Sequence, residues 1–172
     1  MKTRLPALAG LAISLALSAL LPLSVHTADI PKEGNDSFTN FWVATSSDTI
    51  QQGDRTFATY EIDGVTRNDN GGPMFNSFGL RCLGLVEFAG NDGRGQGTCT
   101  YTDKDGDHIF TPYSAKGDGK GGERGTYEVA GGTGKFSGIT GRGEYFNPRT
   151  PIKADDKTAR GVVSNKVSWK LP

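Results

Sequence analysis

Residues 78–102 read FGLRCLGLVEFAGNDGRGQGTCTYT, and this stretch decides the fold of the chain. Apolar or small residues occupy every second position of its first half: Phe78, Leu80, Cys82, Gly84, Val86 and Phe88. Residues 89–95 are rich in glycine, asparagine and aspartate, which favour turns. An extended pattern resumes over residues 96–102, so the stretch predicts two antiparallel strands joined in a hairpin.

Cys82 and Cys99 are the only two cysteines of the chain. If the hairpin turns near residues 90 and 91, the two become cross-strand neighbours on one face, with their Cβ atoms within bridging distance. We therefore predict a structural disulfide that fixes the register of the two strands. A redox or metal-binding role is the alternative for this pair.

The N-terminus has the order of a secretory leader: Lys2 and Arg4, then an uncharged apolar run over residues 5–25, then small residues. The alternative is a permanent membrane anchor, because the run approaches the roughly 18 to 20 residues that span a bilayer. We expect cleavage after Ala28, so residues 1–28 are the signal peptide. The protein is then exported to the periplasm or the extracellular space, where a cysteine pair is usually oxidised.

Residues 29–172 suffice for one domain with a real core. Without Lys2 and Arg4 of the leader, the 19 basic residues fall to 17 against 19 acidic ones. This balance gives no reason to expect a nucleic-acid partner, and no membrane association is expected after cleavage. We expect no cofactor.

Short alternating segments separated by turn residues recur along the whole chain, and none sustains helical spacing. In addition to the hairpin strands they lie at residues 38–44, 57–62, 109–113, 126–130, 141–146 and 163–171. We therefore predict an all-β domain, a single antiparallel barrel of about eight strands, with polar loops at residues 115–125 and 147–160. In the last strand Val163, Asn165, Val167, Trp169 and Leu171 share the buried face.

Asp103, Asp105 and Asp107 alternate like the carboxylates that open a calcium-binding loop. The pattern is incomplete, because His108 stands where such loops have glycine and Ser114 where they have a bidentate glutamate. The alternative is an ordinary hairpin turn, in which Asp and Gly supply the backbone angles. The three aspartates are candidate metal ligands on this pattern alone.

Residues 126–145 read TYEVAGGTGKFSGITGRGEY. Their GGTG turn between two strands resembles that of the allene oxide cyclase and dirigent superfamily, especially the small exported bacterial proteins called allene oxide cyclase barrel-like. Those bacterial relatives also resemble this chain in having one cysteine before the first glycine turn and another just before an Asp-x-Asp-Gly-Asp turn, matched here by Cys82, Cys99 and Asp103–Asp107. The resemblance spans roughly residues 78–145.

This resemblance implies an eight-stranded antiparallel barrel of the calycin type, and plant members imply a hydrophobic barrel cavity and trimers. Dirigent proteins usually carry arginines just after the GGTG element, where this chain has Ser137 and Thr140. A shared fold hosts many unrelated functions, so no catalytic residue is carried over.

The leading functional hypothesis is a non-enzymatic barrel that binds a small apolar or aromatic ligand, with Tyr60, Tyr145 and Trp169 as candidate contacts. The first alternative is a cyclase or isomerase of a reactive lipid or phenolic intermediate. The second alternative is a structural or interaction protein, a trimer associating through Leu83 and Leu85. A filled barrel would exclude both ligand hypotheses, and a buried Glu, Arg or Tyr beside an open apolar pocket would favour the enzyme.

Overall fold

The computed structural model describes residues 30–90, 92–119, 122–148, 152–153 and 158–172. The predicted leader, residues 1–28, lies outside the described residues. The elements are β1 (Glu33–Gln52), β2 (Arg55–Asn68), β3 (Gly79–Ala89), β4 (Asp92–Thr102), β5 (His108–Gly117), β6 (Glu123–Val129), β7 (Gly131–Gly132), a 3₁₀ turn η1 (Gly134–Phe136), β8 (Thr140–Asn147), β9 (Ile152–Lys153) and β10 (Thr158–Lys170). None of the described segments is a helix long and apolar enough to cross a membrane.

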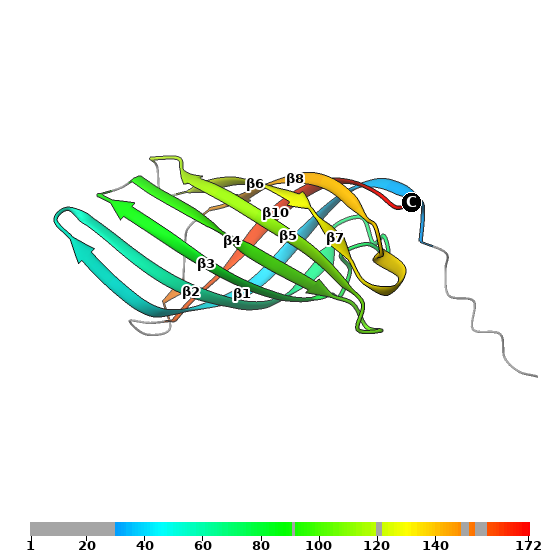
Figure 1. The fold of residues 1–172 in the computed structure, drawn as a ribbon, viewed down its shortest axis with the longest axis horizontal. Helices are drawn as coiled ribbons and strands as arrows, with labels where there is room; N and C mark the ends of the chain where they lie inside the picture. The colour runs from blue at the N-terminus through cyan, green and yellow to red at the C-terminus, as the bar shows by residue number, and fades with distance from the viewer. Residues whose placement is uncertain (1–29, 91, 120–121, 149–151, 154–157) are drawn as a thin grey trace, which may run out of the picture.

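Eight of these strands form a closed antiparallel barrel in the order β1, β2, β3, β4, β5, β6, β8 and β10, and β10 pairs back onto β1 (Figure 1). The two short strands lie beside this cycle, with β7 paired to β5 and β9 paired to β10. The predicted all-β class and eight-stranded barrel are confirmed. Because the barrel is closed, each of the eight strands is paired with a neighbouring strand on both sides.

The β3–β4 hairpin has the predicted register. Ala89 lies opposite Asp92, and Cys82 lies opposite Cys99 with a disulfide between them of S–S length 2.07 Å. The turn is tighter than predicted, because β4 begins at Asp92 rather than near Gln96. The glycine-rich sequence of residues 89–95 predicts a loop, but Gly93 and Gly95 belong to β4 and face the barrel interior.

Six inward-facing aromatic rings each lie over a glycine directly opposite on a neighbouring strand. The pairs are Trp42–Gly161, Tyr60–Gly84, Tyr113–Gly97, Tyr127–Gly143, Tyr145–Gly125 and Trp169–Gly34. A Cβ added to any of these glycines would come within 2.2 to 2.8 Å of the facing ring. These glycines therefore make room for large rings on a wall where two full side chains would collide.

Several strands extend beyond their predicted ends. β1 and β2 include the predicted 38–44 and 57–62 segments but continue to a turn at Gly53. β5 and β6 take up both ends of the predicted loop 115–125. In the predicted loop 147–160, Ile152–Lys153 pairs with Ala159–Arg160, while residues 149–151 and 154–157 lie outside the described residues.

One end of the barrel is filled by the β2–β3 connection, residues 69–78, here called the plug loop. Its Phe75 is fully buried and stacks on Phe38 of β1 with ring centroids 4.3 Å apart. The side chains of Thr66 and Asn68 donate hydrogen bonds to the carbonyls of Phe75 (2.6 Å) and Met74 (2.8 Å). These bonds hold Phe75 at φ 54°, a strained angle for a residue with a side chain.

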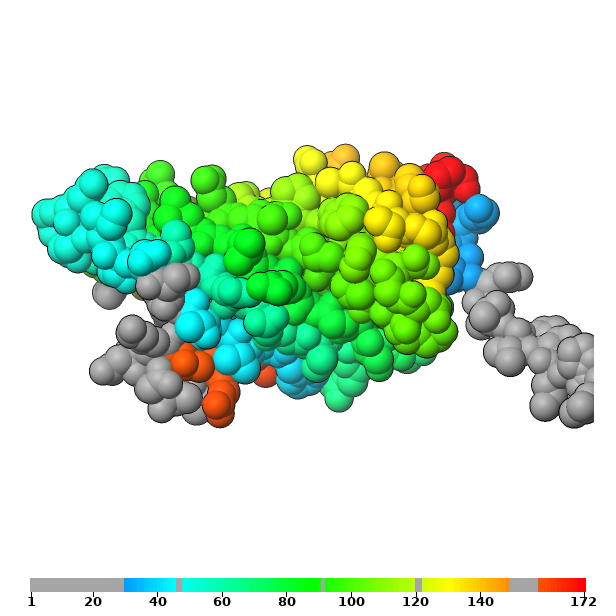
Figure 2. All heavy atoms as spheres, turned by 60° about the horizontal axis from the view of Figure 1, so that its bottom comes forward, coloured from blue at the N-terminus to red at the C-terminus, as the bar shows by residue number. Residues whose placement is uncertain are grey.

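The same end carries both described chain ends and the buried residues of the GGTG turn. The Leu171 amide donates a hydrogen bond to the Lys32 carbonyl at 2.7 Å. Phe136 and Ile139 are fully buried, and they belong to the same hydrophobic core as Phe75 of the plug loop. The first described residues (blue) and the last (red) emerge together in Figure 2, opposite the projecting β1–β2 turn (cyan). The hydrophobic core is therefore concentrated in one half of the barrel.

We expect Phe75→Ala to lower the free energy of unfolding by about 3–5 kcal/mol, because it leaves a cavity where a fully buried ring stood. Chemical denaturation monitored by circular dichroism measures this change. Phe41→Ala is the matched control, since Phe41 is 40% exposed on the outer face, and its cost should stay below about 1 kcal/mol. Equal costs for the two variants would contradict the assignment of the plug loop.

Candidate functional site

The half of the barrel opposite the plug loop contains a cavity of about 390 Å³. Its wall comes from all eight barrel strands and is mostly apolar. The lining residues are Asn40, Trp42, Ala44, Tyr60, Ile62, Leu80, Cys82, Val86, Phe88, Gly95, Cys99, Tyr101, Thr111, Tyr113, Glu123, Tyr127, Tyr145, Asn147, Ala159, Val163 and Asn165. The barrel is thus not filled, and the condition that would have excluded ligand binding is not met.

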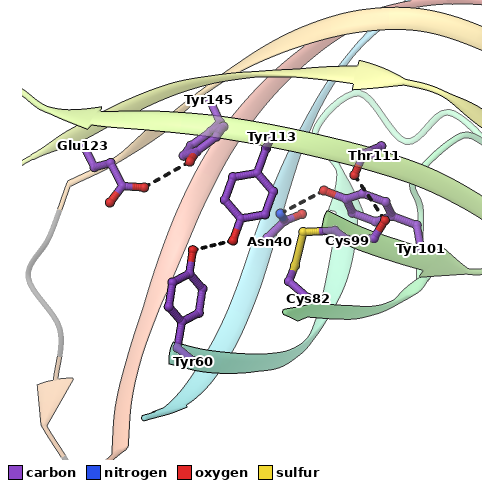
Figure 3. The surroundings of a disulfide bond; sticks show 9 residues. All are labelled: Asn40, Tyr60, Cys82, Cys99, Tyr101, Thr111, Tyr113, Glu123 and Tyr145. Atoms are coloured by element: carbon purple, nitrogen blue, oxygen red, sulfur yellow. Dashed lines mark hydrogen bonds between the residues drawn. A yellow bond between two sulfur atoms is a disulfide. The ribbon is translucent and has the colours of Figure 1, made fainter. Parts of the chain in front are cut away.

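Tyr60, Tyr113 and Tyr145 form a cluster on the cavity wall (Figure 3). The hydroxyls of Tyr60 and Tyr113 are hydrogen-bonded to each other where their rings meet over the β3–β4 hairpin. Tyr145 packs edge-to-face on Tyr113 with ring centroids 6.2 Å apart, and its hydroxyl donates to Glu123 Oε1 at 3.0 Å. Each of the three hydroxyls therefore has a hydrogen-bond partner within the cluster.

Burial raises the pKa of Tyr60, Tyr113 and Tyr145 above the ordinary value of 10.0. For Tyr145 the neighbouring Glu123 carboxylate adds to this rise, since it disfavours a second negative charge. The three phenols are consequently neutral at physiological pH and present hydrogen-bonding groups to the cavity without charge.

The deep wall of the cavity, toward the plug loop, contains the disulfide and a buried polar pair. Cys82 and Cys99 both line the cavity, so the bond that fixes the hairpin register is also part of the cavity wall (Figure 3). Asn40 Nδ2 donates to the Tyr101 hydroxyl at 3.4 Å. Burial raises the pKa of Tyr101 to about 12.

Formal charge is nearly absent from the wall. Among the described lining residues there is no Lys, Arg or His, and Glu123 is the one carboxylate. Glu123 lies at the start of β6, on the open side of the barrel, and faces inward together with Gly125 and Tyr127. The cavity therefore has a weakly polar, anionic rim and an uncharged interior.

The structure places the three predicted ligand contacts in different halves of the barrel. Tyr60 and Tyr145 line the cavity. Trp169 does not; it is 4% exposed at the plug end, where its Nε1 donates to Asp36 Oδ2 at 2.7 Å. Trp169 faces inward as predicted, but alternation fixes only the face of a residue and not its height along the barrel.

Several cavity residues were missed by the sequence interpretation, most notably Glu123 and Tyr113. Glu123 fell in the predicted loop 115–125, although β6 begins at this residue. The inward alternation of Glu123, Gly125, Tyr127 and Val129 was the signal that could have placed it. Glycine at alternate positions concealed the signal, because glycine was interpreted as turn.

The three predicted metal ligands converge on a lysine. Lys135 of the GGTG turn forms ion pairs with Asp103 and Asp105, and its Nζ lies 3.9 Å from Asp107 Oδ2. The Asp103 carboxylate also accepts the backbone amides of Asp105 and Asp107, both at 2.9 Å. Among the described residues, no group of three or more acidic, His or Cys side chains is arranged to hold a metal ion. Calcium binding stays a prediction, and it would require displacement of the ammonium group.

The contacts within this cluster shift the pKa values of Asp103, Asp105 and Lys135. Burial opposes ionisation of Asp103, but hydrogen bonds from Lys135 and from two backbone amides lower its pKa below 3.8. Hydrogen bonds from Lys104 and Lys135 lower the pKa of Asp105 to about 2. The two aspartates in turn raise the pKa of Lys135 above 10.5. The cluster thus ties the β4–β5 turn to the GGTG turn electrostatically.

No protein-family model matches the chain, and no curated protein sequence matches it. Among solved structures, the chain is similar to a pterocarpan synthase that is a dirigent protein, with a TM-score of 0.47 and 11% sequence identity. The match covers 84% of this chain and 94% of that chain. No activity or binding residue is taken from it.

We expect Lys135→Met to lower the melting temperature by roughly 2–6 °C at pH 7, because three carboxylates lose their shared cation. The depressed pKa values of Asp103 and Asp105 confer stability above pH 3.8 that is lost as the pH falls toward about 2. The raised pKa of Lys135 confers stability below pH 10.5 that is lost as the pH rises through the raised value. Melting curves should therefore differ most between about pH 4 and pH 10.

Lys104→Met is the matched control for the lysine cluster. Lys104 pairs with Asp105 alone and its side chain is 77% exposed, so the melting temperature should fall far less. A pH-independent difference between Lys135→Met and the unmodified protein would argue against the charge cluster as the cause.

Proposed function

We propose that the protein binds one small, uncharged, largely apolar molecule in the barrel cavity. The observation that carries the proposal is a cavity of about 390 Å³ within the barrel, opposite the end filled by the plug loop. This volume falls within the roughly 300–1,000 Å³ of ordinary small-molecule sites. The aromatic rings of Tyr60, Tyr113 and Tyr145 favour an aromatic or otherwise flat ligand.

The charge of the wall favours a neutral ligand over an acid. An ionised carboxylate moved into this cavity would lose its hydration and find no Lys, Arg or His among the described lining residues. It would also approach the Glu123 carboxylate at the rim, which repels it. A fatty acid or other carboxylate would therefore bind with its charged group outside, or weakly.

A second candidate function is isomerisation or cyclisation of the bound molecule. The Tyr145–Glu123 hydrogen bond places a neutral phenol and a carboxylate side by side at the edge of an apolar cavity. Such a pair can hold or move a proton on a substrate that the cavity keeps folded, with burial strengthening each interaction. This is the arrangement that favours an enzyme over a passive binder.

Association between copies of the chain remains a further proposal. Leu83 and Leu85 lie on the outer face of β3 and are 55% and 41% exposed, so they are positioned to contact a second protein. A sizing measurement that returns a monomer would remove the support for a trimer.

We expect the purified protein to carry a neutral small molecule, detected by extraction and untargeted mass spectrometry. Ala44→Phe is the control, because Ala44 lies opposite Ala159 on the cavity wall and a larger side chain occupies the space of the ligand. Its extract should lack the compound while its melting temperature stays near that of the unmodified protein. The same compound in both extracts would show that it binds elsewhere.

We expect 2-acetylnaphthalene to bind at least 10-fold more tightly than 2-naphthoate, two probes that differ mainly in charge, as measured by isothermal titration calorimetry. Glu123→Gln should narrow this ratio by strengthening naphthoate binding, since the variant removes the negative charge at the rim. Stronger binding of naphthoate to the unmodified protein would refute the neutral-ligand proposal.

The enzyme hypothesis is tested with the same Glu123→Gln variant. The unmodified protein, incubated with a neutral apolar extract, should convert a compound into an isomer of equal mass and different chromatographic retention. Glu123→Gln should bind 2-acetylnaphthalene within about 3-fold of the unmodified protein and lose the conversion, because only the proton-accepting carboxylate has changed. An unchanged conversion would exclude Glu123 from the chemistry.

A further inference from the structure

Two polar atoms in the cavity wall have no hydrogen-bond partner among the described residues: Asn40 Oδ1 and Trp42 Nε1. Both belong to cavity-lining side chains of β1, and both atoms are buried. Leaving such an acceptor and donor unpaired costs about 1–3 kcal/mol each. Buried polar groups are paired as a rule, so two exceptions inside one cavity require an explanation.

The two side chains are oriented by their other contacts. Asn40 is 6% exposed, and its Nδ2 donates to the Tyr101 hydroxyl, which leaves the carbonyl as the free end of the amide. The Trp42 ring lies over Gly161, whose added Cβ would come within 2.5 Å of it. Neither side chain can turn away without loss of these contacts, so the acceptor and the donor are held ready.

The other polar side chains in the described wall contrast with this pair. The hydroxyls of Tyr60 and Tyr113 are hydrogen-bonded to each other, and the Tyr145 hydroxyl donates to Glu123 Oε1. Asn165 donates to the carbonyls of Phe38 (3.3 Å) and Val163 (3.1 Å). Among the fully buried polar side-chain atoms of the described wall, the two β1 atoms are those without a hydrogen-bond partner.

We infer that Asn40 and Trp42 form a two-point recognition site that selects neutral ligands carrying an N–H or O–H donor at one end and an acceptor atom at the other. Asn40 accepts the donor at the deep end, and Trp42 donates to the acceptor nearer the mouth, because β1 runs from the plug end toward the open end. Residues two apart on a strand lie about 7 Å apart, so donor and acceptor are separated by roughly one ring system. The inference rests on the proposed neutral-ligand cavity.

The donor half is tested with 2-phenylindole and 1-methyl-2-phenylindole, which differ in one N–H. The unmodified protein should bind the N–H probe at least 10-fold more tightly in fluorescence titrations. Asn40→Leu should bring the two affinities to within about 3-fold by weakening only the N–H probe. Should Asn40→Leu fail to fold, Asn40→Ala gives the same comparison with a shorter side chain that also lacks an acceptor.

The acceptor half is tested with 2-acetylnaphthalene and 2-isopropenylnaphthalene, in which a methylene group replaces the carbonyl oxygen. Calorimetry should give about 10-fold tighter binding of the ketone to the unmodified protein. Trp42→Phe keeps an aromatic ring over Gly161 and removes the N–H, so the advantage of the ketone should disappear. Val162→Ala, a change on the outer face of β10 where the side chain is 41% exposed, should preserve the advantage.

The outcomes separate this inference from the proposed function. Binding of all four probes with equal affinities within each pair overturns the two-point site and leaves the apolar cavity intact. Failure of every probe to bind overturns the proposed function itself. Discrimination that survives Asn40→Leu and Trp42→Phe shows that other groups read the ligand, and it overturns the assignment to β1.

Discussion

The barrel depends on one repeated contact, an aromatic ring lying over a glycine directly across the strand pair. Six such pairs run around the inside of the wall, at both ends of the barrel. Each ring takes the space of two side chains and covers the backbone of its neighbour, which compensates for glycine's weak preference for strands. The same contact fixes register, because a slip of one residue would turn each ring to the other face of the sheet, away from the glycine that makes room for it.

This arrangement divides the interior into two halves with different roles. Toward the plug loop, the fully buried side chains of Phe38, Phe75 and Phe136 fill the barrel and contribute to its hydrophobic stabilisation. Toward the mouth, the rings of Trp42, Tyr60, Tyr113 and Tyr145 lie over glycines, and a cavity is left between the walls. The cavity is thus a product of how the aromatic residues are paired, and stability and binding are assigned to opposite ends of one sheet.

Local pattern predicted the hairpin, its register and the disulfide, because alternation and a single cysteine pair define one geometry. It could not predict the plug loop, since Phe75 is buried by stacking on Phe38, which is distant from it in the chain. It placed Tyr60 and Tyr145 on the inner face but could not give their height, which separates them from Trp169. The Asp103–Asp107 turn had the composition of an ion site, and only the fold brings Lys135 into it.

Both described ends of the chain leave the barrel beside the plug loop, where the Leu171 amide bonds the Lys32 carbonyl and Lys32 Nζ bonds the Pro172 carbonyl at 2.8 Å. The described chain ends and the projecting β1–β2 turn therefore lie at opposite ends of the molecule (Figure 1), and the cavity lies in the half of the barrel away from the chain ends. A fusion partner, an affinity handle or a surface tether joined at either terminus would display the opening toward solvent and leave the route into it unobstructed.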